Sequence, residues 1–114
     1  MSRIVEIRTY TLHPGARPDF DRLVIEHSLP MLARWKVDVV TYGRSLHDDL
    51  SCFLIRAYDS LEHRKASQDA FYGSAEWKEG PRKAILALIE GYTTVVVEMD
   101  ARAVEALRSG SAPA

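Results

Sequence analysis

The chain has one cysteine, no long hydrophobic run and almost no net charge, and each shortage excludes a class of protein. Cys52 has no second cysteine to pair with, so an intrachain disulfide is impossible. No apolar stretch approaches the roughly 20 residues that span a bilayer, and no apolar segment of the signal-peptide type follows Met1. We therefore expect neither membrane insertion nor secretion, and a cytoplasmic location.

Charge and missing motifs exclude further partners. A formal net charge of −1 gives no electrostatic reason to bind nucleic acid or an anionic membrane. Phosphate-binding loops, the dinucleotide fingerprint and the nucleophilic-serine motif are all missing from the sequence. The four histidines are scattered, and no two of them share a helical face beside a carboxylate. The sequence therefore predicts no metal site and no cofactor.

What the chain does have is a regular order of strand and helix patterns. Strand patterns cover residues 3–12, 37–46, 51–58 and 92–99, and helix patterns cover residues 19–35 and 60–90. This β-α-β-β-α-β order predicts a ferredoxin-like α+β fold with a four-stranded antiparallel sheet. We expect one domain over residues 1–99, followed by a short terminal helix and a flexible tail over residues 100–114.

Both helical regions contain residues that interrupt a helix. Pro30 lies inside the first region and removes a backbone donor, so we expect an interruption there. In the second region, Gly73 and the pair Gly80 and Pro81 predict two or three separate pieces. The last strand is almost entirely β-branched, which is typical of a central strand covered on both faces.

One face of the predicted sheet carries a row of polar side chains. Alternation places Glu6, Arg8 and Tyr10 together on the first strand, and Arg56 on the strand that lies beside it in this fold. Two interpretations stay open: an ion-pair network that serves the structure, and a cleft that binds an anion or a phenol. In the second interpretation Arg8 or Arg56 is the electrostatic anchor. Tyr10 or Tyr42 is then the hydrogen-bond donor.

His27, Tyr72 and Trp77 also have more than one interpretation. His27 falls in the apolar stripe of the first helix. It is either a hydrogen-bonded core residue or a general acid or base that lines a pocket. A third option makes it an axial haem ligand. Tyr72 and Trp77 flank a helix break, as core anchors or as walls of a pocket under that break. The interruptions predict a cavity between helices and sheet, lined by Tyr10, His27, Tyr42, Arg56 and Trp77.

Three segments of the chain resemble the NIPSNAP family. They are residues 4–12 (IVEIRTYTL), residues 53–61 (FLIRAYDSL) and residues 71–77 (FYGSAEW), the last running into GPR at residues 80–82. The resemblance covers residues 3–98 and implies a dimeric α/β barrel, in which two ferredoxin-like subunits pair their sheets. It implies no established activity. The positions that match the family pattern include Arg8, Tyr10, Arg56, Tyr72, Trp77 and Arg82.

Three functional hypotheses follow. The leading one is a homodimer that binds a small organic molecule between sheet and helices, with these ligand-binding residues: Arg8, Tyr10, Tyr42, Arg56 and Trp77. The first alternative is a cofactor-independent monooxygenase or isomerase, in which His27 or Tyr10 moves a proton. The second is a non-catalytic interaction module, in which the arginines serve only the dimer. The sequence leaves open whether the protein is an enzyme.

Overall fold

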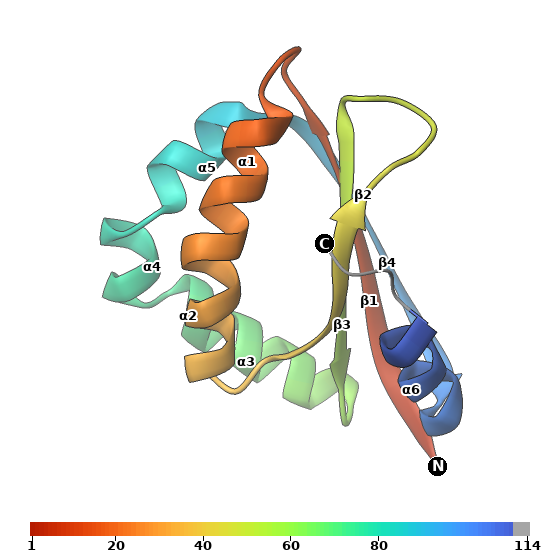
Figure 1. The fold of residues 1–114 in the computed structure, drawn as a ribbon. Coiled ribbons are helices and arrows are strands. Elements are labelled where there is room, and N and C mark those ends of the chain that lie inside the picture. The colour runs from red at the N-terminus through yellow and green to blue at the C-terminus, as the bar shows by residue number, and fades with distance from the viewer. Residues whose placement is uncertain (111–114) are drawn as a thin grey trace.

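A computed structural model describes residues 1–110 and shows a sheet with one layer of helices against it (Figure 1). The strands are β1 (Ser2–Leu12), β2 (Asp38–Arg44), β3 (Ser51–Tyr58) and β4 (Ile89–Asp100). All neighbours pair antiparallel, in the order β2-β3-β1-β4. The predicted ferredoxin-like α+β fold with a four-stranded antiparallel sheet is therefore confirmed.

Six helices and one π turn, joined by loops, connect and follow the strands of the described chain. The first helical region contains α1 (Arg17–Leu23), the π turn η1 (Val24–Ser28) and α2 (Leu29–Arg34). The second contains α3 (Leu61–Tyr72), α4 (Ala75–Glu79) and α5 (Arg82–Leu88), on the same side of the sheet (Figure 1). The expected terminal helix is present as α6 (Ala101–Gly110) on the opposite side, and the expected tail from residue 111 on lies outside the described residues. Among residues 1–110, no helix combines the length and the hydrophobicity that a bilayer crossing requires.

The second helical region is broken where the sequence predicts. α3 ends at Gly73, and the Ser74 hydroxyl accepts a hydrogen bond from the backbone N–H of Trp77, which caps α4. Gly80 ends α4, and Pro81 stands immediately before α5. This part of the helix layer is therefore three short pieces rather than one continuous helix.

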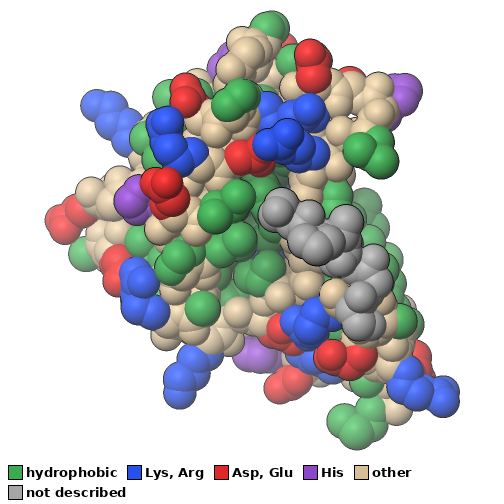
Figure 2. Space-filling model, viewed as in Figure 1, with side chains coloured by type: hydrophobic (Ala, Val, Ile, Leu, Met, Phe, Trp, Pro, Cys, Tyr) green, Lys and Arg blue, Asp and Glu red, His purple; other side chains and the backbone are tan. Residues whose placement is uncertain are grey.

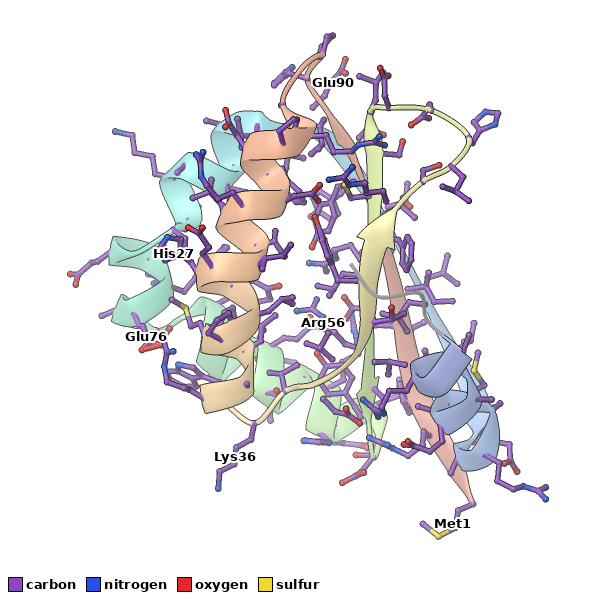
Figure 3. All side chains as sticks on the ribbon, in the orientation of Figure 1. Met1, His27, Lys36, Arg56, Glu76 and Glu90 are labelled. Carbon is purple, nitrogen blue, oxygen red and sulfur yellow. The ribbon has the colours of Figure 1, made fainter. Side chains whose placement is uncertain are left out.

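The first helical region contains a π turn that changes which residues face the sheet. The Leu29 N–H donates to the carbonyl of Val24, five residues back, and Pro30 follows in the first turn of α2. In this wider turn Ser28, rather than His27, follows Val24 on the inner side: Ser28 is buried and His27 is exposed. Figure 3 shows His27 on the side of the helix that faces away from the sheet. The predicted position of His27 in a cavity wall is therefore wrong.

β4 is an edge strand, which corrects the expectation of a central strand covered on both faces. In the observed strand order it pairs with β1 alone. Val95 and Val96 point to opposite faces of the sheet and are 54% and 36% exposed. The β-branched side chains of β4 therefore include valines that are exposed on both faces of the sheet.

Buried apolar side chains form one cluster on each face of the sheet. The larger cluster fills the space between the sheet and helices α1–α5. The smaller one consists of Val5, Val40 and Ala57 from the sheet and Val104 from α6. α6 covers only one end of its face (Figure 1), and no other helix of the described chain lies over the rest of that face.

Candidate functional site

A cavity of about 40 Å³ lies between the helix layer and the sheet. Figure 2 shows hydrophobic side chains gathered around a hollow at this place. Because one water-sized sphere needs about 10–15 Å³, the cavity has room for about three non-hydrogen atoms. Strands and helices both contribute to the wall, which includes Tyr10, Tyr42 and Leu54 from the sheet and Ser28, Tyr72 and Trp77 from the helices.

The structure brings some of the predicted lining residues to the cavity and leaves others out. Tyr10, Tyr42 and Trp77 line it. His27 is exposed to solvent. Arg56 is 1% exposed but lies behind the wall rather than in it. Among residues 1–110, no group of three or more His, Cys, Asp or Glu side chains is placed to hold a metal ion.

Beside the cavity, one buried carboxylate holds three arginines. Oε1 of Glu6 accepts a hydrogen bond from Arg56 at 2.5 Å and lies 3.3 Å from Nη2 of Arg8. Oε2 accepts from Nε of Arg64 at 2.8 Å and from the side-chain amide of Gln68. Arg8 and Arg56 therefore pair through Glu6, in an ion-pair network of the kind that the sequence analysis gave as one of two interpretations, and Figure 3 shows Arg56 directed from the sheet toward the helices. Burial alone would raise the pKa of Glu6, but the charges of Arg56 and Arg8 outweigh it and hold that pKa below its ordinary value.

Tyr72 links this charge network to the cavity. Its hydroxyl oxygen accepts hydrogen bonds from Nη1 of Arg56 at 2.8 Å and from Nη1 of Arg8 at 3.4 Å. Its side chain also lines the cavity. Since both guanidinium groups face the oxygen lone pairs, the phenolic proton of Tyr72 is left to donate to another group. The sequence analysis offered Tyr72 as a core anchor or a pocket wall beside the helix break, and it did not predict the contacts of Tyr72 with the two arginines.

The other two phenols of the wall have different roles. The hydroxyl of Tyr42 donates to Asp21 at 2.6 Å, so Tyr42 presents its ring rather than its hydroxyl. Burial and this hydrogen bond raise the pKa of Tyr42. Burial also raises the pKa of Tyr10, to about 12, against the opposing charges of Arg8 and Arg56. Both phenols are therefore protonated at neutral pH, and neither acts as a base.

Ser28 contributes a buried polar atom to the cavity wall. Its side chain lines the cavity, it is only 8% exposed, and its Oγ has no hydrogen-bond partner among the described residues. Buried hydroxyls normally have a partner, because leaving one unpaired costs about 1–3 kcal/mol. Ser28 therefore marks the cavity as a place for a further polar atom. Sequence patterns missed Ser28 because the π turn that points it inward has no clear sequence signal.

Replacing Ser28 with alanine is expected to raise the free energy of unfolding by about 1 kcal/mol, since it removes a buried hydroxyl that has no partner within residues 1–110. Urea denaturation measures the change. Ser67→Ala in α3, outside the cavity wall, is the control for the higher helix propensity of alanine. If Ser28→Ala gained no more than Ser67→Ala, the hydroxyl would already be satisfied in solution.

Comparison with known proteins assigns the chain to a family. The NIPSNAP family model matches residues 5–97. The chain belongs to the NIPSNAP family. The match ends within β4, so α6 of this NIPSNAP protein lies beyond the matched region. Among curated proteins, none is similar enough to count as a match.

Solved structures of NIPSNAP proteins share the fold. A NIPSNAP family protein from Agrobacterium tumefaciens has a TM-score of 0.79 at 20% identity, over 87% of each chain. An uncharacterized NIPSNAP domain protein from Burkholderia xenovorans has 0.75 at 24% identity, over 86% of this chain and 95% of that one. A putative antibiotic biosynthesis monooxygenase from Bordetella bronchiseptica has 0.61 at 22% identity, over 88% of this chain and 97% of that one. At such identities the similarity shows the fold alone.

Proposed function

We propose that this NIPSNAP protein binds a small, mostly apolar organic molecule in the cavity between the helix layer and the sheet. The observation that carries the proposal is the buried hydroxyl of Ser28, which has no partner among the described residues and lies on a mostly apolar wall. Apolar walls with a few placed polar groups are typical of small-molecule sites. Because Ser28 and Tyr72 both have a proton to donate, the bound molecule carries a hydrogen-bond acceptor.

The size of the cavity limits the ligand. Its space suits a short branched alkyl group of about three non-hydrogen atoms. A larger group requires the aromatic wall to move. Tyr72 is the last residue of α3, Trp77 lies in α4, and Gly73 stands in the break between the two helices. Hinges often form at such helix ends. This break is therefore the place at which the cavity can widen.

The alternative of a cofactor-independent monooxygenase or isomerase has less support. His27 is exposed, and the raised pKa of Tyr10 keeps its phenol protonated. In the described part of the chain, the cavity wall contains no Asp, Glu, His or Lys that could act as a general base. A protonated tyrosine can still stabilise an enolate or a phenolate, so this alternative is confined to steps that need only an acid.

We also propose that the protein is a cytoplasmic homodimer. On the face without α1–α5, Ile7 and Ile55 are half-buried and Val95 is largely exposed, which suits contact with a second copy. The buried, unpaired Cys52 suits a reducing compartment. The hypothesis of a non-catalytic interaction module depends on the same face and differs from the leading one because it needs no ligand.

A titration followed by NMR tests the binding. Isobutyramide has a branched alkyl group and a carbonyl acceptor, and phenylacetamide is a larger neutral probe for a widened cavity. We expect a saturable shift of the indole N–H resonance of Trp77, because Trp77 lines the cavity. Trp35 is the internal control, since its indole N–H donates to Glu76 outside the cavity.

A blocking variant locates the binding. Leu29→Phe adds volume to the cavity wall, and Leu61→Phe adds the same volume at a side chain that is 59% exposed. The Trp77 shift should disappear in Leu29→Phe and persist in Leu61→Phe. Absence of a saturable shift in the wild type with both amides and with the corresponding acids, isobutyrate and phenylacetate, would refute the proposal. A shift that persists in Leu29→Phe would place the binding outside this cavity.

A further inference from the structure

Three guanidinium groups share a single carboxylate next to the cavity. Arg8, Arg56 and Arg64 each form an ion pair with Glu6. Within residues 1–110, no other carboxylate forms an ion pair with any of the three. The cluster therefore has an excess of positive charge in a place where water screens it poorly. Such an excess favours the binding of an anion.

Arg8 is the arginine of this cluster with donors to spare. Its contacts are long: 3.3 Å to Glu6, 3.2 Å to the hydroxyl of Thr94 and 3.4 Å to the hydroxyl of Tyr72. N–H···O hydrogen bonds are most often about 2.9–3.0 Å long, so these are weak. A guanidinium presents five N–H donors in a planar fork that matches a carboxylate. Arg8 can thus bind a second carboxylate without breaking a strong contact.

The position of Arg8 connects the cavity with the solvent. Its side chain is 16% exposed, and its guanidinium lies 5.2 Å from the ring centre of Tyr92, a residue that is 64% exposed. On its other side Arg8 contacts Tyr72, which lines the cavity. A molecule whose apolar part occupies the cavity therefore meets Arg8 directly beyond Tyr72.

We infer that the ligand is a small organic acid, with its carboxylate on Arg8 and its apolar body in the cavity. This inference rests on the proposed function and names the chemical class of the ligand. Arg56 and Arg64 hold Glu6 by short contacts, so they supply the fixed positive field. Tyr72 supplies a proton donor between the carboxylate and the apolar wall.

Matched acids and amides test this inference. Isobutyrate and isobutyramide have the same shape and differ in charge, as do phenylacetate and phenylacetamide. We expect each acid to bind the wild type about tenfold more tightly than its amide, because a charge-assisted pair is stronger than a neutral hydrogen bond. The advantage of the acid should shrink as salt rises, since Arg8 is partly exposed.

Variants of Arg8 assign the carboxylate to one residue. In Arg8→Gln the acid should lose about tenfold in affinity while the amide keeps its own. Arg8→Lys keeps the charge but loses the fork, so an intermediate loss is expected and the test survives if the glutamine variant folds poorly. Arg102→Gln is the matched control, because the side chain of Arg102 is 94% exposed on α6.

The outcomes separate this inference from the proposed function. Equal affinity of acid and amide for the wild type would overturn the inference and leave the proposed function standing. An acid preference that survives unchanged in both Arg8 variants would also overturn it. Failure of every acid and amide to shift the Trp77 resonance would reject the proposed function itself.

Discussion

Replacing Glu6 with glutamine is expected to lower the free energy of unfolding by about 3–5 kcal/mol. Glu6 is completely buried and is the shared partner of three arginines. A neutral amide in its place leaves Arg56, which is 1% exposed, without a counter-charge. Because a domain of this kind has a total stability of about 5–15 kcal/mol, the variant should be close to unfolding.

Urea denaturation followed by circular dichroism measures this loss. Glu26→Gln is the matched control, since Glu26 is exposed, and its effect should stay within about 0.5 kcal/mol. Adding Arg56→Met to Glu6→Gln should recover part of the stability, because it removes the most deeply buried of the unpaired charges. A loss in Glu6→Gln no larger than in Glu26→Gln would contradict the view that the buried carboxylate organises the network.

The carboxylate of Glu6 also makes the free energy of unfolding depend on pH. Burial alone would raise the pKa of Glu6, yet Arg56 and Arg8 hold it below the ordinary value of 4.5 in the folded protein. The unfolded chain therefore takes up the proton at higher pH than the folded chain. The stabilisation that ionised Glu6 gives the folded protein is complete above the ordinary pKa and is lost as the pH falls through the pKa of the folded state. Below pH 4.5 the free energy of unfolding of the wild type should fall more steeply than that of Glu6→Gln, so that the two values approach each other.

The charge network could be predicted from the sequence because strands have a regular period. Alternation alone puts Glu6 and Arg8 on one face of β1. The antiparallel register then places Glu6 directly opposite Arg56 on β3. Arg64 and Gln68 come from α3, and no pattern predicts which turn of a helix lies over which strand residue. Contacts within the sheet were therefore accessible from the sequence, and contacts between the layers were not.

The helical wall of the cavity shows where periodicity fails. A regular helix places His27 in the apolar stripe, but the π turn η1 replaces it with Ser28. Pro30 indicates that the helix is interrupted, but it does not show whether the interruption is a kink, a break or a π turn. β4 fails for another reason, since β-branched residues suit both an internal strand and a surface that a partner covers. Composition cannot distinguish these two kinds of burial, although strand order does.

Replacing Val95 with glutamate is expected to dissociate the proposed homodimer and to raise its dissociation constant at least about 100-fold. Ile7 pairs in register with Ile55 on one side and with Val95 on the other, so the three form an aliphatic row across β3, β1 and β4. This row lies on the face without α1–α5. A twofold axis brings the substitution into the interface twice, and each buried carboxylate without a partner costs several kcal/mol.

Light scattering across a dilution series measures the mass of the wild type and the variants. Leu61→Glu puts the same charge on an exposed leucine of α3, and it should leave the dimer intact. A monomeric wild type at every concentration would reject the dimer, and a Val95→Glu dimer as tight as the wild type would place the interface elsewhere. Because Val95 and the cavity lie on opposite faces of the sheet, the Val95→Glu monomer should keep the Trp77 shift with isobutyramide. Binding that persists without the dimer would show that each subunit carries a complete site.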